Sequence, residues 1–403
     1  MLYNAVIFDC ALSLSALTSV RTRKKARLRT GGLFIITTLD TTIPELEFKR
    51  NFAACVARHR ALRSARRGCL ILTSVGTEDD PFWMSAPLPA LENIDFGKDP
   101  LYMPRVFCER AEELFAARAD YPDDYIPYLS PRYGTGIIGG MLLGDLQFGA
   151  NTSWTGEVGS SLEEAIEFPW GSENIWIERV VDALNYMARR LQGKCYVFLE
   201  GYETPLEWAA MVRGSALYLE ICTEPDKVHE LLRRSDTALM WLYDLLESRV
   251  QKVEYGALAH SLWMEQRCIP FLSDDSAGLM SPQHYAEFGV PYTEAMFRRL
   301  GGGFLHFHTL GYHQMDNLSS MDSLTMYNWR QDPNTAQPED ILETLLPGAQ
   351  AKIVLIGLTP AQVREKIHLL SQGRFVIYSR CQTRREQEDL VHFVHENAPI
   401  MPA

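Results

Sequence analysis

The chain has 403 residues, of which 46% are hydrophobic and 22% are charged, and its formal net charge is −12. This composition is typical of a globular protein, and the acidic balance argues against non-specific binding of nucleic acid. No apolar run approaches the roughly 18 residues that a membrane-spanning helix needs. We therefore expect neither a nucleic acid nor a membrane among its partners.

The N-terminal part has the opposite charge from the rest. Residues 1–70 carry 13 Lys and Arg against 4 Asp and Glu, and the densest part is RTRKKARLR at 21–29. The basic cluster follows an apolar stretch containing Asp9, which is the wrong order for a secretory signal. Because no aromatic residues interleave with the charges, we expect a solvated basic extension over residues 1–45, rather than a nucleic-acid-binding arm, on a cytoplasmic protein.

Helix-like and strand-like segments alternate along the remaining chain. In its first half, helices are predicted at 48–67, 105–118, 161–168 and 174–191, and strands at 69–74, 125–129 and 195–200. Thr223, as a cap, and Pro225 then start a helix that runs to Val250. The C-terminal part contains strands predicted at 269–273, 304–308, 325–329, 352–356 and 375–378.

Two later helix starts are clearly marked. One lies at Ser281–Pro282 and the other at Thr359–Pro360, where Gln362 completes a capping box. Short buried strands separated by amphipathic helices favour parallel pairing through right-handed crossovers. We therefore predict an α/β fold, a (β/α)8 TIM barrel forming a single domain over residues 46–403. An open doubly wound sheet is the alternative, although no G-x-G-x-x-G follows a strand.

In such a barrel, functional residues gather where strands end. His306 and His308 end one strand, and residues i and i+2 of a strand project to the same side. Two imidazoles at this spacing can bind one divalent ion, whereas the alternative is a pair of buried neutral histidines. Cys381 ends a later strand and is a candidate third ligand. His313 lies farther into the loop and is expected to be structural or to face the substrate.

Acidic residues end two other strands. Asp274 and Asp275 are adjacent, so in an extended backbone they point opposite ways, and Asp274 is our candidate general base. Its alternative role is an Asx turn. Tyr202 and Glu203, in FLEGYETP, are further candidate catalytic residues, and Glu203 could support a metal-bound histidine or cap the next helix.

Residues 271–311, FLSDDSAGLMSPQHYAEFGVPYTEAMFRRLGGGFLHFHTLG, resemble the uroporphyrinogen decarboxylase superfamily. PLEWAAMVRGSALYLEICTEPDKVHELL (205–232) and VLIGLTPAQVREKI (354–367) add to the resemblance, which covers about residues 105–395. The arginine-rich signature of the decarboxylase itself is missing, and its late Gly-His-Gly is replaced by Ser379–Arg380–Cys381. Without these two motifs, we do not expect decarboxylation of a tetrapyrrole.

The cobalamin-dependent methyltransferase branch of that superfamily binds zinc through His-x-Cys on one strand and Cys on a later one. The corresponding positions here are His306, His308 and Cys381, so a histidine replaces the middle cysteine. The resemblance implies a zinc-dependent enzyme that moves a methyl group between a corrinoid, carried on a partner protein, and a small thiol or related nucleophile. A homodimer is a further option for its assembly.

Three other functions stay open. One is a decarboxylase-like lyase acting on a non-porphyrin carboxylic acid through Asp274, without a metal. Another is a metal-dependent hydrolase, because a two-histidine site also suits activation of water or an alcohol. That class, however, carries its H-x-H on the first barrel strand, whereas this pair lies three-quarters along the chain. The third is a non-catalytic binding protein.

Overall fold

The computed structural model describes residues 29–30, 33–34, 45–76, 89–251, 256–265 and 268–403. Contacts divide the chain into two units, Met1–Thr42 and Ile43–Ala403. In the first unit, β1 (Arg29–Thr30) pairs antiparallel with β2 (Leu33–Phe34). Most of the predicted basic extension lies outside the described residues. No helix in the part of the chain that the structure describes is long and apolar enough to cross a membrane.

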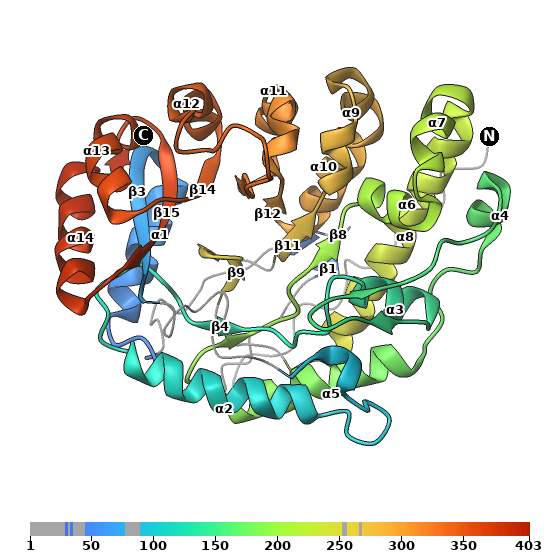
Figure 1. The fold of residues 1–403 in the computed structure, drawn as a ribbon, viewed down its shortest axis with the longest axis horizontal. Coiled ribbons are helices and arrows are strands. Elements are labelled where there is room, and N and C mark those ends of the chain that lie inside the picture. Colours follow the sequence, from blue (N-terminus) through green and yellow to red (C-terminus); the bar gives the residue numbers. More distant parts are fainter. Residues whose placement is uncertain (1–28, 31–32, 35–44, 77–88, 252–255, 266–267) are drawn as a thin grey trace, which may run out of the picture. The chain divides into compact units, whose positions relative to one another are not determined.

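The second unit is a mixed α/β structure built on an eight-stranded sheet, ordered β16-β3-β15-β14-β13-β12-β11-β8 (Figure 1). All neighbours pair in parallel except β16, which runs antiparallel to β3. The strands are β3 (Ala65–Val75), β8 (Tyr202–Glu203), β11 (Ile269–Ser273), β12 (Gly303–His306), β13 (Met326–Asn328), β14 (Ile353–Gly357), β15 (Arg374–Cys381) and β16 (Met401–Pro402).

The first long strand of this unit pairs with the last one before the C-terminal edge strand. β3 and β15 are in register from Gly68↔Arg374 to Val75↔Cys381. A separate parallel pair joins β4 (Tyr128–Leu129) to β7 (Tyr196–Val197). The second unit therefore brings its first and last long strands together in a parallel ladder, and the segment between β3 and β8 contributes a further parallel pair.

Side chains, instead of a strand ladder, connect β3 to the segment before β4. Asp124 Oδ2 accepts the N–H of Ile71 at 2.9 Å, and Asp123 Oδ2 accepts the N–H of Thr73 at 2.9 Å. The Asp124 N–H donates in return to the Ile71 carbonyl at 2.8 Å. Two buried carboxylates thus satisfy backbone groups that a neighbouring strand would otherwise satisfy.

These two carboxylates are paired with buried or half-buried cations. Lys49 Nζ lies 2.8 Å from Asp123, and Arg58 Nε lies 2.8 Å from Asp124. His395 Nε2 lies 3.1 Å from Asp124. Burial raises the pKa of Asp124, but the hydrogen bond from His395 and the charge of Arg58 outweigh it and hold the pKa well below its usual range. These partners therefore keep the Asp124 carboxylate ionised.

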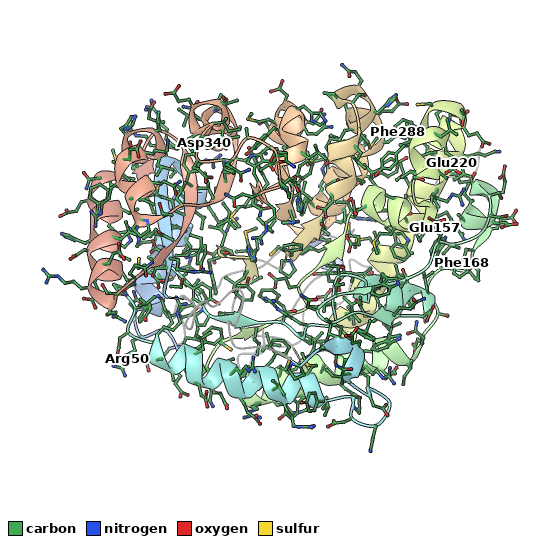
Figure 2. All side chains as sticks on the ribbon, in the orientation of Figure 1. Arg50, Glu157, Phe168, Glu220, Phe288 and Asp340 are labelled. Carbon is green, nitrogen blue, oxygen red and sulfur yellow. The ribbon has the colours of Figure 1, made fainter. Side chains whose placement is uncertain are left out.

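Helices lie outside the strands, and α9 to α14 follow one another around β11 to β15 (Figure 1). Side chains occupy the space between the ribbons (Figure 2). The helices are α1 (Phe52–Arg63), α2 (Tyr102–Ala117), α3 (Ile137–Leu143), α4 (Leu162–Glu167), α5 (Ile175–Arg190), α6 (Pro205–Arg213), α7 (Ala216–Thr223), α8 (Pro225–Arg249), α9 (Pro282–Phe288), α10 (Val290–Leu300), α11 (Met315–Ser320), α12 (Leu342–Ala351), α13 (Pro360–Leu370) and α14 (Arg384–Asn397).

Helix starts test the sequence predictions directly. The capping box of α13 is confirmed, with the Gln362 N–H donating to Thr359 Oγ1 and the Thr359 N–H donating to Gln362 Oε1. The predicted cap at Thr223 is wrong: this residue ends α7, and its hydroxyl donates to the Leu219 carbonyl at 3.1 Å. The predicted helix over 48–67 ends earlier, at Arg63, because β3 already begins at Ala65.

Short elements complete the second unit. β5 (Gln147–Phe148) pairs antiparallel with β6 (Ser153–Trp154), and β9 (Ala257–Ala259) pairs antiparallel with β10 (Leu262–Met264). Three 3-10 helices, η1 (Leu91–Asn93), η2 (Asp275–Leu279) and η3 (Thr309–Gln314), are also described. η2 follows β11 and η3 follows β12, so both begin where central strands end.

Candidate metal centre

The carboxyl ends of three neighbouring strands lie at one level. Ser273, the last residue of β11, pairs with Glu203 of β8 on one side and with His306 of β12 on the other. In a parallel ladder, paired residues project to the same face. The topology therefore assembles a set of polar side chains that are distant in sequence at one edge of the sheet.

The His306 ring is oriented by Asn328 of β13. Its Nδ1 lies 3.1 Å from Asn328 Oδ1, which also accepts the Phe307 N–H at 3.2 Å. Because that amide oxygen is an acceptor, Nδ1 carries the ring proton and Nε2 has a lone pair. Burial lowers the pKa of His306 to about 3, with further contributions from the charges of His308 and His260. The ring is therefore neutral at physiological pH.

Asp332 orients the His308 ring in the same way. His308 Nδ1 lies 2.8 Å from Asp332 Oδ1, and Asp332 Oδ2 accepts the Leu310 N–H at 2.9 Å. Burial raises the pKa of Asp332, but hydrogen bonds from Leu310 and His308 lower it overall. An ionised carboxylate thus holds the Nδ1 proton, which leaves the lone pair on His308 Nε2.

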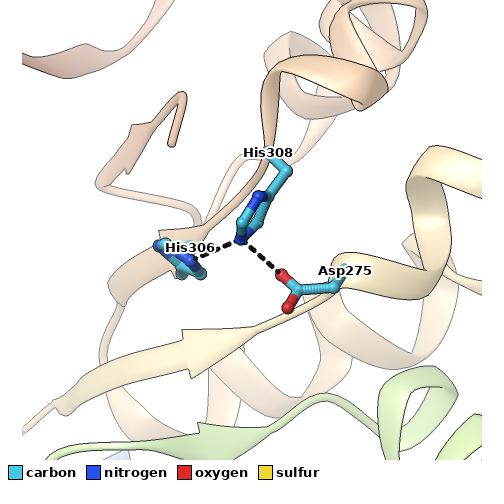
Figure 3. Close-up of side chains that lie close together, drawn as sticks. All are labelled: Asp275, His306 and His308. Atoms are coloured by element: carbon cyan, nitrogen blue, oxygen red, sulfur yellow. Dashed lines mark hydrogen bonds and ion pairs between the residues drawn. The ribbon is translucent and has the colours of Figure 1, made fainter. Parts of the chain in front are cut away.

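The two Nε2 atoms converge with a carboxylate (Figure 3). His306 Nε2 and His308 Nε2 are 3.2 Å apart, and Asp275 Oδ1 lies 3.6 Å from His308 Nε2. Ligands bound at 2.0–2.1 Å in tetrahedral geometry are about 3.3 Å from each other. Of the residues described, only Asp275, His306 and His308 form a group of three or more potential metal ligands whose donor atoms lie within 4.8 Å of one another.

Asp275 enters this group from the start of η2. Its carboxylate accepts a hydrogen bond from Ser273 Oγ at 3.2 Å, and half of its side-chain surface is exposed. Burial raises the pKa of Asp275, while the charge of His308 and the hydrogen bond from Ser273 oppose that rise. The donor set is two imidazoles and one carboxylate, each with an identified hydrogen-bonding partner. Such a set can bind a divalent cation and leave positions for a substrate.

Cys381 lies outside this group of donor atoms. It ends β15, it is fully buried, and its register partner is Val75 of β3. β15 is three strands away from β12 in the sheet order, whereas β11, which leads to Asp275, is the direct neighbour of β12. Cys381 does not belong to the group of ligand atoms found among the described residues. Its role as the third ligand stays a prediction.

Asp274 faces the opposite way from Asp275. Its carboxylate is fully buried and accepts hydrogen bonds from Tyr285 Oη at 2.9 Å and Ser276 Oγ at 3.2 Å. Burial raises the pKa of Asp274 well above its usual value, and the charge of Glu207 raises it further. These contacts connect β11 to α9, so the structure brings Asp275 rather than Asp274 to the two histidines.

The other candidates lie close to the group without joining it. Glu203 is buried beside Glu207, Asp275 and Asp274, and burial followed by these charges raises its pKa well above the usual value. Tyr202 is buried and packs edge-on against Tyr243 of α8, with ring centroids 6.3 Å apart. The helix-capping role considered for Glu203 belongs to Thr204, whose hydroxyl accepts the N–H of Glu207.

His313 is not part of the group that contains the other two histidines. Its Nε2 lies 2.8 Å from the Met280 carbonyl oxygen, which is the structural role expected for it. Three residues of the site were not given roles by the sequence: Asp275, Asn328 and Asp332. The available signal was their position immediately at or after the ends of β11 and β13, next to the strand that carries H-x-H.

No protein-family model matches the chain, and a comparison with curated proteins found no relative. The resemblance to the uroporphyrinogen decarboxylase superfamily therefore rests on the sequence segments themselves.

Proposed function

We propose that the protein is a metal-dependent enzyme on a (β/α)8 barrel, with zinc bound by His306, His308 and Asp275. The observation that supports the metal most directly is the convergence of the two Nε2 atoms at 3.2 Å. Two facing acceptors repel unless a cation or a proton lies between them. The fixed Nδ1 protons on both rings are the arrangement that metal-binding histidines use.

Three features support the barrel. β3 pairs with β15, parallel pairing continues from β15 through to β8, and β4 pairs with β7. β7 and β8 are separated by only a few residues, so together they continue the order from β11 towards β4. The Asp123 and Asp124 contacts then bridge the step from β4 back to β3. The ligands lie at the carboxyl ends of the strands, where active sites of this fold occur.

The proposed reaction is transfer of a methyl group between a corrinoid carrier protein and a small thiol or related nucleophile. When bound, zinc would lower the pKa of the thiol and hold it as a thiolate. Asn328 and Asp332 keep both imidazoles in the ligating tautomer, and Asp275 contributes negative charge. The corrinoid donor is supported only by the superfamily resemblance of residues 205–232, 271–311 and 354–367.

A metal-dependent hydrolase is the second candidate. The observation that favours it is the donor set itself, because a carboxylate rather than a thiolate accompanies the two histidines. Histidine and carboxylate ligands are those of zinc sites that activate water. The two candidates share the metal and differ in the nucleophile.

The test compares zinc-loaded protein with protein stripped by a chelator. The first assay measures loss of the methyl group from methylcobalamin in the presence of 2-mercaptoethanol, and the second measures hydrolysis of a panel of activated esters and amides. Zinc-dependent demethylation supports the methyltransferase. Hydrolysis without demethylation supports the second candidate, and equal rates with and without zinc in both assays would contradict the proposed function.

A further inference from the structure

A second group of polar side chains lies next to the candidate metal centre. It consists of Tyr128 of β4, Glu200 just after β7, and His260 between β9 and β10. His260 Nδ1 lies 2.9 Å from Glu200 Oε1 and 2.7 Å from Tyr128 Oη, and the Tyr128 hydroxyl donates to Glu200 Oε1 at 3.1 Å. Only 12% of the His260 side chain and 20% of the Glu200 side chain are exposed.

The His260 backbone is strained. β9 and β10 are joined through two residues, His260 and Ser261, because Ala259 pairs with Leu262. His260 has φ of 51°, and among the described non-glycine residues only Asn334 shares a positive φ. Asparagine and glycine are the usual residues at this position of a two-residue hairpin. A histidine held there is strained, and such strain concentrates at functional sites.

Aromatic packing places this histidine beside the metal ligands. The His260 ring stacks on Phe304 with centroids 4.7 Å apart, and Phe304 lies two residues before His306 on β12. Phe271 contacts both rings, with its centroid 5.9 Å from that of His260 and 5.1 Å from that of His306. The two imidazoles therefore flank the same phenylalanine.

The partners of His260 suit a histidine that moves a proton. Burial raises the pKa of Glu200, but the hydrogen bonds from His260 and Tyr128 help to outweigh it, so the carboxylate is ionised. Burial raises the pKa of Tyr128 well above its usual value, so the phenol is neutral and donates. The backbone of Glu200 is also held in place, because its N–H donates to Ser130 Oγ at 2.9 Å. The Nδ1 side of the ring is thus held by Glu200 and Tyr128, as in a histidine whose other ring nitrogen, Nε2, exchanges a proton.

We propose that His260 is the general acid–base residue of the reaction at the His306–His308–Asp275 centre, and that Glu200 and Tyr128 position its ring. This inference rests on the proposed function. The proton of the substrate S–H or O–H group passes to His260 Nε2, and the electron pair of that bond stays on the sulfur or oxygen. Nδ1–H keeps its hydrogen bond to Glu200, whose negative charge stabilises the imidazolium. The proton returns by the reverse path.

The test counts protons when a thiol binds. Zinc-loaded protein at pH 7 is titrated with 2-mercaptoethanol by calorimetry in two buffers that differ in ionisation enthalpy. In the wild type, the protein keeps the thiol proton, so net release is close to zero. In His260→Asn, where asparagine tolerates the positive φ, about one proton is released per thiol bound. Glu200→Gln, which keeps the shape of the side chain, shifts release in the same direction.

The control is His313→Asn, which removes a histidine outside both groups and should release as few protons as the wild type. Equal proton release by the wild type and His260→Asn, with zinc and thiol both bound, would overturn this inference alone. Zinc binding without thiol binding would overturn it as well, since no substrate proton would then be present. If the wild type binds no zinc, the proposed function fails and this inference fails with it.

Discussion

His306 and His308 direct their Nε2 atoms at each other across 3.2 Å, while an oxygen acceptor on a neighbouring segment holds each Nδ1. Neither ring can turn to relieve this contact without breaking its bond to Asn328 or Asp332. The arrangement is therefore built by the residues around the pair and does not depend on H-x-H alone.

Asp332 should control metal affinity without binding the metal. Asp332→Asn removes the charge that fixes the Nδ1–H tautomer of His308, so zinc affinity should fall about 10- to 100-fold. The measurement is competition with a chromophoric chelator. Asp340→Asn, an exposed acid in the same segment, is the control and should bind zinc like the wild type. Equal affinity for Asp332→Asn would show that the His308–Asp332 bond does not support the site.

The third ligand is Asp275 in the proposed site, whereas the superfamily resemblance implies Cys381. Variants of these two residues distinguish the alternatives. If Asp275 is the ligand, Asp275→Ala should lose zinc, and Cys381→Ala should retain it with only the stability cost of a truncated buried side chain. Zinc content of the two purified variants, measured by mass spectrometry after dialysis, separates these outcomes. Loss of zinc in Cys381→Ala but not in Asp275→Ala would support the ligand set that the superfamily resemblance implies.

Asp124 should be essential for stability. Asp124→Asn leaves Arg58 and His395 without their buried carboxylate, and removing one partner of a buried ion pair costs about 3–5 kcal/mol. The measurement is the free energy of unfolding in urea at pH 7. The control, Asp120→Asn, removes the exposed pair with Arg50, which should contribute about 1 kcal/mol or less. Similar costs for both variants would contradict the role given to the β3–β4 connection.

Glu203 should make the metal-free protein less stable as pH rises. Its pKa is raised in the folded state by burial and by Glu207, so above the unfolded value of about 4.3 unfolding releases a proton. The free energy of unfolding therefore falls with increasing pH until the folded pKa is passed. Glu203→Gln should show a shallower fall between pH 5 and 8 in urea denaturation with a chelator present. Profiles parallel to those of the wild type and the exposed-site control Glu343→Gln would contradict this assignment.

Elements in the C-terminal half of the fold could be predicted from the sequence more accurately than those in the first half. The strand predicted at 269–273 coincides with β11, and the capping box at Thr359 starts α13 as expected. Strand pairing near β4 was harder to foresee, because Asp123 and Asp124 replace a ladder with side-chain hydrogen bonds. Apolar periodicity cannot predict that side chains replace strand pairing, since this arrangement depends on partners as distant in sequence as His395.

The candidate site could also be predicted only in part from the sequence. The spacing of His306 and His308 indicated that the two rings share a side, and the structure brings their Nε2 atoms together. The alternation of side chains also indicated that Asp274 and Asp275 face opposite ways, but not which of them faces the histidines. A hydrogen bond decides this, because Tyr285 on α9 donates to the buried Asp274 carboxylate and so holds it against α9. A tertiary contact of this kind has no local sequence signal.

The central claim is that the histidine pair and Asp275 bind a metal ion, and metal content tests it most directly. Protein purified without chelators is dialysed against zinc and then against zinc-free buffer, and zinc per chain is measured for the wild type and His308→Ala. We predict about one zinc ion per chain in the wild type and almost none in the variant. Absence of stoichiometric zinc from the wild type, or equal zinc in both proteins, would contradict the account.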